Sequence, residues 1–76
     1  MVHAYVMVQT AAGKSEELLS AIESIPPVEE AHIVAGDYDI IAEVDAGAVY
    51  DVLEAVSSDI QSHDGVTDTR TYIAMV

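Results

Sequence analysis

Residues 28–45 decide the fold, and they read VEEAHIVAGDYDIIAEVD. Two β-rich runs, residues 28–35 and 38–45, flank the pair Gly36-Asp37 in this stretch. Glycine adopts a positive φ without steric cost, and such a pair between two β-rich runs is typical of a tight hairpin turn. We therefore expect two antiparallel strands that are joined at Gly36 and Asp37.

A helix is expected on each side of this hairpin. Before it, apolar residues recur at helical spacing from Leu18 to Ile25. Pro26-Pro27 ends this helix, because proline supplies no N–H and disfavours helical geometry in the residue before it. After the hairpin, residues 49–60 carry the clearest amphipathic pattern, and Asp45 is the expected N-terminal cap. The apolar side of this second helix is expected to comprise Val49, Val52, Leu53, Val56 and Ile60.

Residues 2–9 and 66–76 supply the first and last strands. The resulting order is β-α-β-β-α-β, in two similar halves that each contain a strand, a helix, a valine (Val28 or Val66), two polar residues and a β-rich run. This order predicts a ferredoxin-like α+β domain, whose four-stranded antiparallel sheet has the order 4-1-3-2 and carries both helices on one face. The residues expected on the helix-covered face are Val2, Ala4, Val6, Val8, Tyr38, Ile40, Ala42 and Val44.

The opposite, open face of the sheet is expected to be too apolar to remain in water. The residues expected on it include Tyr5, Met7, Ile41 and either Thr69, Ile73 and Met75 or Tyr72. A large exposed apolar face calls for a partner, and a second sheet is its natural cover. We therefore expect a dimer of the α+β barrel type.

The composition restricts the possible partners. The chain has 76 residues, which suits one domain, and its 51% of hydrophobic residues argues against intrinsic disorder. Its 14 acidic and 2 basic residues give a formal net charge of −12. With Lys14 and Arg70 as its only lasting positive charges, the chain cannot neutralise a run of phosphates. Direct nucleic-acid binding is therefore not expected.

The same charge disfavours anionic membrane surfaces, and no apolar run approaches the roughly 18 residues of a spanning helix. The chain also begins with a strand-like alternation rather than a signal peptide, so we expect no membrane partner and a cytoplasmic location. Acid-rich surfaces resemble those of salt-adapted proteins, because 1 M salt shortens the Debye length to about 3 Å and screens self-repulsion. A halophilic source is the favoured interpretation, and a cationic partner is the alternative.

The sequence indicates no catalytic or metal site. Cysteine is absent, which removes thiolate nucleophiles, thiolate zinc sites and iron–sulfur clusters. His3, His32 and His63 lack metal-ligand spacing and are interpreted as surface or sheet-face residues. No serine lies in a nucleophile elbow. We therefore expect neither an enzyme nor a cofactor or metal.

In the hairpin, Tyr38 lies between the carboxylates of Asp37 and Asp39. A turn alone does not require this arrangement. Backbone N–H groups around Gly36 could receive a small carboxylate, while Asp37 or Asp39 could hold an ammonium group. That chemistry suits a zwitterionic amino acid. Turn chemistry explains the same residues equally well, because Asp favours turns and Tyr favours strands.

One set of short motifs extends along essentially the whole chain: Gly13, Ile25-Pro26-Pro27-Val28, Gly36-Asp37-Tyr38-Asp39, Gly65-Val66 and Thr69-Arg70-Thr71. With these motifs the chain resembles the effector domain of the Lrp/AsnC family of transcriptional regulators, also called the RAM domain. The resemblance implies dimers built by packing of sheets, rings of dimers such as octamers or decamers, and amino acids bound between neighbouring dimers. The implied effector-binding residues are Gly36, Asp37, Tyr38 and Asp39, with Thr69 and Thr71 as weaker candidates.

Full-length members of that family carry an N-terminal helix-turn-helix domain, whereas this chain begins at the first effector strand. We therefore expect one effector domain over residues 1–76, without a helix-turn-helix domain. The leading hypothesis is a non-enzymatic amino-acid-binding and oligomerisation module in transcriptional or metabolic regulation, which could co-assemble with full-length relatives. The alternatives are a purely structural assembly domain and, last, a small dimeric α+β barrel enzyme with His3 or His32 as its base.

Overall fold

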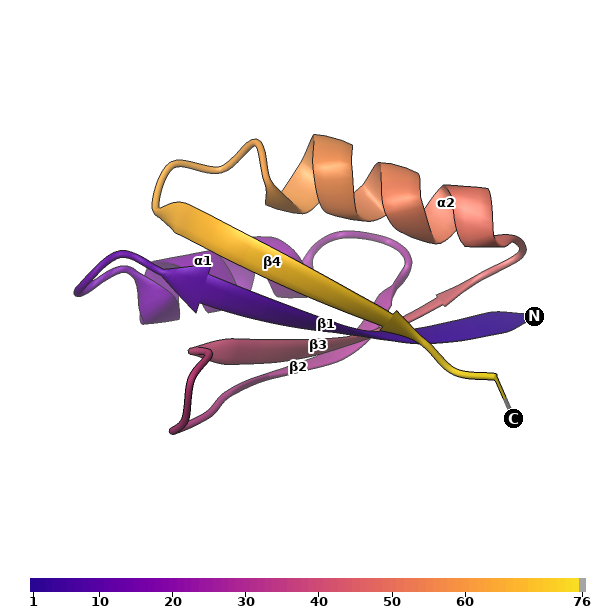
Figure 1. The fold of residues 1–76 in the computed structure, drawn as a ribbon. Coiled ribbons are helices and arrows are strands. Elements are labelled where there is room, and N and C mark those ends of the chain that lie inside the picture. The colour runs from indigo at the N-terminus through magenta and orange to yellow at the C-terminus, as the bar shows by residue number, and fades with distance from the viewer. Residues whose placement is uncertain (76) are drawn as a thin grey trace.

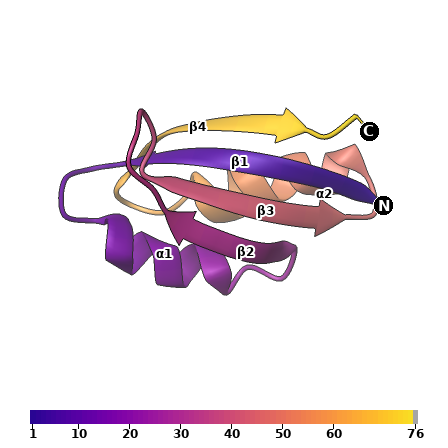
Figure 2. The same cartoon turned by 90° about the horizontal axis from the view of Figure 1, so that it is seen from below.

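The computed structural model describes residues 1–75 and contains a four-stranded sheet with two helical segments packed against it (Figure 1). The elements are β1 (Val2–Thr10), α1 (Ser15–Glu23), β2 (Val28–Ile33), β3 (Ile40–Ala46), α2 (Val49–Glu54), its π-helical continuation η1 (Ala55–Ile60) and β4 (Val66–Ile73). All three strand pairs are antiparallel, in the order β2-β3-β1-β4. Figure 2 shows the four strands side by side with α2 behind β1 and β3. The predicted fold and strand order are confirmed.

The core lies between the helices and one face of the sheet. The alternation in the two central strands accounts for it, because every second residue of a strand points to the same face. The side chains that are at most 5% exposed are Ala4, Val6 and Val8 of β1, Ile40, Ala42 and Val44 of β3, Leu18 and Ile22 of α1, and Val52, Ala55, Val56 and Ile60 of α2 and η1. Burial of one such isoleucine or valine contributes roughly 1.5–3 kcal/mol.

The register of β4 decides what its residues face. Tyr5 lies opposite Tyr72, Met7 opposite Arg70, and Val8 opposite Thr69. Residues directly opposite each other share a face, so Thr69, Thr71 and Ile73 lie on the helix-covered face, whereas Arg70 and Tyr72 lie on the open face. Tyr72, and not Thr69 and Ile73, therefore lies on the open face. The open face comprises His3, Tyr5 and Met7 of β1, Glu30 and His32 of β2, Ile41, Glu43 and Asp45 of β3, and Arg70 and Tyr72 of β4.

Each half of the chain has a register shift just after its strand-opening valine, Val28 or Val66. Val28 pairs with Val44 and Glu30 with Glu43, which leaves Glu29 as the extra residue of a bulge in β2. In β4, a similar shift follows Val66. The two polar residues after each valine, Glu29-Glu30 and Thr67-Asp68, are therefore the site of a bulge. At a bulge, successive side chains no longer alternate regularly between the two faces of the sheet. In β2, the bulge brings Glu29 beside the open face.

The predicted tight turn at Gly36-Asp37 is wrong. β2 ends at Ile33 and β3 begins at Ile40, so the connection is a wider loop of residues 34–39. The Val34 N–H donates to the Asp39 carbonyl at 2.8 Å, and the Asp39 N–H donates to the carbonyl of Val8 at 2.9 Å. The hydrogen bonds of Asp39 close the loop and hold it against β1, so the third strand begins at Ile40 and not at Tyr38. The positive φ values expected at a tight turn occur instead at Gly13 and Gly65.

The second helix also differs from the prediction. Asp45 does not cap it, because Asp45 lies within β3 and the N-cap position is Ala48, which makes no side-chain hydrogen bond. Val49 and Leu53 are 45% and 51% exposed, since the packed side consists of Val52 of α2 and Ala55, Val56 and Ile60 of η1. β4 ends at Ile73, and Val76 lies outside the described residues. Within residues 1–75, no helix has the length and apolar character needed to cross a membrane.

Candidate functional site

The loop of residues 34–39 is held against the end of β1. The Gln9 side-chain amide donates to the carbonyl of Asp37 at 3.4 Å, and the Thr10 N–H donates to the Asp39 carboxylate at 2.8 Å. The Thr10 hydroxyl lies 2.9 Å from the hydroxyl of Ser15, at the start of α1. The Asp39 carboxylate therefore links the loop to β1 and, through Thr10, to the first helix. Gly36 and Asp37 are exposed beside this anchor.

Tyr38 of the loop lies near Arg70, the single arginine of the chain. A hydrogen bond with Tyr72, and then the proximity of Tyr38, raise the pKa of the Arg70 guanidinium above its ordinary value. A permanent cation thus lies on the open face near two phenolic side chains. Sequence reasoning did not select Arg70 as a site residue. The sequence feature that indicated its position was the strand alternation in Thr69-Arg70-Thr71. This alternation places Arg70 on the face of the sheet opposite both threonines.

The two threonines lie apart from the loop. Thr69 accepts a hydrogen bond of 2.6 Å from the Gln61 side-chain amide, on the helix-covered side of the edge strand β4. Thr71 lies opposite Val6 on the same side. A cavity of about 220 Å³ is lined by Gln61, Val66, Thr67, Asp68 and Thr69. The predicted site residues are therefore found in two places, one at residues 36–39 and one beside the outer edge of β4.

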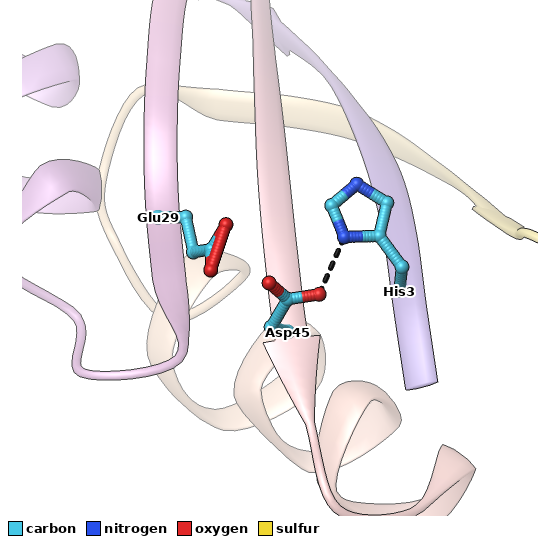
Figure 3. Close-up of side chains that lie close together, drawn as sticks. All are labelled: His3, Glu29 and Asp45. Atoms are coloured by element: carbon cyan, nitrogen blue, oxygen red, sulfur yellow. Dashed lines mark hydrogen bonds and ion pairs between the residues drawn. The ribbon is translucent and has the colours of Figure 1, made fainter. Parts of the chain in front are cut away.

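A second group of polar side chains, the histidine–carboxylate cluster, comprises His3, Glu29, Glu43 and Asp45. His3 and Asp45 are opposite residues of β1 and β3, and the His3 Nδ1 pairs with the Asp45 carboxylate (Figure 3). The His3 Nε2 lies 3.2 Å from the Glu43 Oε1. Glu29 approaches Asp45 from β2, on the side away from the imidazole (Figure 3). One ligand-type atom from each of His3, Glu29 and Asp45 lies within 4.8 Å of the other two.

The cluster perturbs the proton affinity of its members. Hydrogen bonding to Asp45 is the main cause that raises the pKa of His3. Hydrogen bonding to Asp45 also raises the pKa of Glu29, while the bonds from Glu29 and His3 lower the pKa of Asp45. Ionisation of two carboxyl groups in contact is unfavourable without a compensating positive charge. The cluster therefore favours the protonated forms of His3 and Glu29.

Sequence reasoning missed this cluster, because its members come from three strands and no fixed spacing joins them. The prediction that the three histidines are scattered holds for their positions relative to one another. His32 pairs only with Glu30 among the described residues, at 3.2 Å, and their side chains are 62% and 59% exposed. His63 follows η1 as an exposed residue. The cluster could have been found from the pairing of the first and third strands, because this pairing places His3 opposite Asp45 and close to Glu43.

Comparison with known families gives a match over nearly the whole chain. The family model described as the Lrp/AsnC ligand binding domain matches residues 3–76. The chain is 30% identical over 60 residues to the leucine-responsive regulatory protein of Haemophilus influenzae, which covers 79% of this chain and 36% of that protein. It is 36% identical over 61 residues to an uncharacterised HTH-type transcriptional regulator of Pyrococcus furiosus, which covers 80% of this chain and 41% of that protein. The chain thus spans less than half the length of these curated relatives.

Solved structures share the fold. A protein from Thermus thermophilus has a TM-score of 0.96 at 32% identity, over 100% of this chain and 95% of that chain. AsnC of E. coli has a TM-score of 0.91 at 24% identity, over 99% of this chain and 51% of that chain. A transcriptional regulator of Neisseria meningitidis, solved as a complex with L-Met, has a TM-score of 0.87 at 18% identity, over 99% of this chain and 50% of that chain. The last two show a shared fold alone.

Proposed function

Because this chain belongs to the Lrp/AsnC ligand-binding domain family, we propose that it binds a small effector of the amino-acid class and acts in the regulation of transcription or metabolism. The observation that carries the proposal is the family match over residues 3–76. The L-Met complex of the Neisseria meningitidis regulator supports the class of ligand. The curated relatives are named as regulators, which supports a non-enzymatic role.

The proposed binding site consists of residues 36–39 and the neighbouring Arg70. An amino acid presents one carboxylate and one ammonium group, and a guanidinium is the strongest side-chain partner for a carboxylate because it donates two parallel hydrogen bonds. Arg70 is assigned to the carboxylate, and the exposed Asp37 to the ammonium group. Tyr38 and Tyr72 lie near the guanidinium. Gly36 leaves the loop backbone accessible, and Asp39 holds the loop against β1.

Assembly is the second part of the proposal. Tyr5 and Tyr72 are 39% and 52% exposed on the open face, although both are aromatic. Packing two open faces together would remove these rings from water and form a homodimer of the α+β barrel type. Further association into octameric or decameric rings, or with full-length relatives, would use other surfaces. Thr69 and Thr71 of the edge strand β4 are assigned to contacts with a neighbouring subunit or with an effector held by it.

The regulatory role is proposed to operate without direct contact to nucleic acid, because the net charge of −12 opposes phosphate binding. A cytoplasmic location belongs to the same proposal. One observation favours the second candidate, a domain that only assembles: the Asp39 carboxylate is already used to hold Thr10. In that case the loop residues serve the fold alone and no amino acid binds.

A calorimetric screen of the common amino acids in 1 M KCl tests the proposal. We expect one amino acid to bind, and Arg70→Gln to abolish that binding while the fold is retained. Lys14→Gln is the matched control, because Lys14 is the only other lysine or arginine and pairs with Glu17 at 3.7 Å on α1. Light scattering in parallel measures the mass of the assembly. If no amino acid binds but the protein is oligomeric, the assembly-only candidate is correct; a monomer would contradict both.

A further inference from the structure

We propose that His3, Glu29 and Asp45 form a binding site for a divalent transition-metal cation of the zinc type. The three side chains come from β1, β2 and β3, so a bound cation would join three neighbouring strands at one end of the open face (Figure 3). This site is independent of the proposed amino-acid site, which involves the opposite end of β1 and β4.

The geometry of the three side chains suits one ion. Ligand atoms around a tetrahedral zinc ion, each about 2.1 Å from the metal, lie about 3.4 Å apart. The candidate ligand atoms of His3, Glu29 and Asp45 lie within 4.8 Å of one another. The three side chains are half-buried or exposed, so core packing does not block their rotation toward a shared ion.

Glu43 orients the imidazole ring of His3. A histidine that binds a metal through one ring nitrogen almost always donates a hydrogen bond from the other nitrogen to a carboxylate, a carbonyl or water, which fixes the orientation of the ring. The His3 Nδ1 is directed at Asp45, and its Nε2 lies 3.2 Å from the Glu43 Oε1. The ring is therefore already oriented with one nitrogen toward the other candidate ligands and the second toward an outer carboxylate.

The bulge in β2 is the feature that completes the set. Bulges re-aim a side chain and are over-represented next to functional sites. Here the register shift between Val28 and Glu30 makes Glu29 the extra residue. The Glu29 carboxylate points toward Asp45 of the neighbouring strand β3. The Asp45 N–H in turn donates to the Pro27 carbonyl at 2.9 Å, which ties β3 to the start of β2 at this point.

The charge balance favours a cation. The carboxylates of Glu43 and Asp45 contact one imidazole, and a third carboxylate, that of Glu29, lies on the far side of Asp45. Within residues 1–75, Lys14 pairs instead with Glu17, and Arg70 is engaged by Tyr72, so the remaining positive group near Asp45 is the N-terminal amine. A divalent cation bound by neutral His3 and two carboxylates would give a neutral first coordination sphere.

The donor set selects the class of metal. Imidazole suits zinc, copper, iron and nickel, whereas magnesium and calcium prefer sites made of oxygen atoms alone. One nitrogen and two carboxylate oxygens are all donor types that zinc accepts, and they leave at least one position for water or another ligand. We therefore expect Zn²⁺ to bind and Mg²⁺ to bind weakly at the same concentration.

The test uses the whole chain, freed of metal with a chelator and titrated with ZnCl₂. Isothermal calorimetry should give one Zn²⁺ per chain, and long-range ¹H–¹⁵N NMR should show the largest shift at the His3 Nδ1. Glu29→Gln and Asp45→Asn, which keep the side-chain size, should each weaken binding by roughly tenfold or more, the scale typical for loss of an important metal partner. His32→Gln is the matched control, because the His32–Glu30 pair offers one histidine and one carboxylate only.

Each outcome supports or overturns the proposal. Retained affinity in both carboxylate variants, or a zinc-induced shift at His32 or His63 in place of His3, would overturn it. The NMR measurement on the unmodified chain decides the question even if a variant fails to fold. Binding of an amino acid is measured separately after chelation, so the failure of one proposal leaves the other intact.

Discussion

Substitution of three glycines by alanine tests the local backbone geometry, because the structure assigns each glycine a different constraint. Gly65 has φ +99°, and an added Cβ would lie 3.2 Å from the Cγ of Lys14 and 3.3 Å from the Cδ1 of Leu18. Gly13 has φ +80°, but no atom of residues 1–75 lies within 4 Å of such a Cβ. Gly36 has neither a positive φ nor a close neighbour among the same residues. The expected order of destabilisation is therefore Gly65→Ala, then Gly13→Ala, then Gly36→Ala.

The magnitudes follow from strain, crowding and chain entropy. A left-handed conformation costs an alanine about 1–2 kcal/mol, and the reduced freedom of the unfolded chain returns about 0.4–1 kcal/mol. Gly13→Ala should therefore lose about 1 kcal/mol of unfolding free energy. Gly65→Ala should lose about 2–3 kcal/mol, since crowding of a packed site adds at least about 1 kcal/mol and Leu18 is buried. Gly36→Ala should stay within about 0.5 kcal/mol of the wild type or be slightly more stable.

Urea unfolding followed by circular dichroism at fixed KCl measures all three variants. A loss of about 2–3 kcal/mol in Gly65→Ala corresponds to a drop in Tm of roughly 10–20 °C for a domain of this size. Equal losses in Gly36→Ala and Gly65→Ala would refute the wide loop at residues 34–39 and restore the tight turn. Equal losses in Gly13→Ala and Gly65→Ala would show that the contacts with Lys14 and Leu18 add nothing.

Three further predictions concern the core, the loop and the charge. Ile22→Ala should lower the unfolding free energy by about 2–5 kcal/mol, because Ile22 is fully buried, whereas Leu53→Ala on the exposed side of α2 should cost far less in the same urea titration. Asp39→Ala should lose about 1–2 kcal/mol with the Thr10 hydrogen bond, and Asp37→Ala, which removes an exposed carboxylate, should not. Tm should rise between 0.1 and 1 M KCl, as the Debye length falls from about 10 to about 3 Å, and no rise would contradict the interpretation of the acidic surface as a salt adaptation.

The parts of the fold that depend on hydrophobic alternation could be predicted from the sequence. The alternation of Ala4, Val6 and Val8 with polar or larger residues has one consistent interpretation, since a slip of one residue would turn the entire apolar row to the other face. The width of the β2–β3 loop was not predictable in this way. It depends on the hydrogen bond from the Asp39 N–H to the Val8 carbonyl, which joins residues far apart in the chain and is not visible in a local turn pattern.

The candidate sites divide along the same line. Residues 36–39 could be selected because their chemistry is concentrated in one short segment, but Arg70 and the histidine–carboxylate cluster depend on pairing between strands. The cluster also requires the bulge that presents Glu29, and a bulge changes the face of a side chain without leaving a fixed sequence signature. Both sites therefore depend on the register between strands that are distant in the chain, and the sequence alone does not define that register.

The open face combines two features that oppose each other. Tyr5 and Tyr72 favour burial against a second sheet, whereas the carboxylates of Glu43 and Asp45 on the same face oppose loss of water. Burial of an ionised group is costly unless it is paired, and one imidazole cannot neutralise both of these carboxylates together with Glu29. Screening by salt reduces repulsion between whole subunits but does not replace lost hydration at the cluster. If two open faces pack together as proposed, the cluster must therefore bind a cation or a proton. This requirement adds to the general effect of salt.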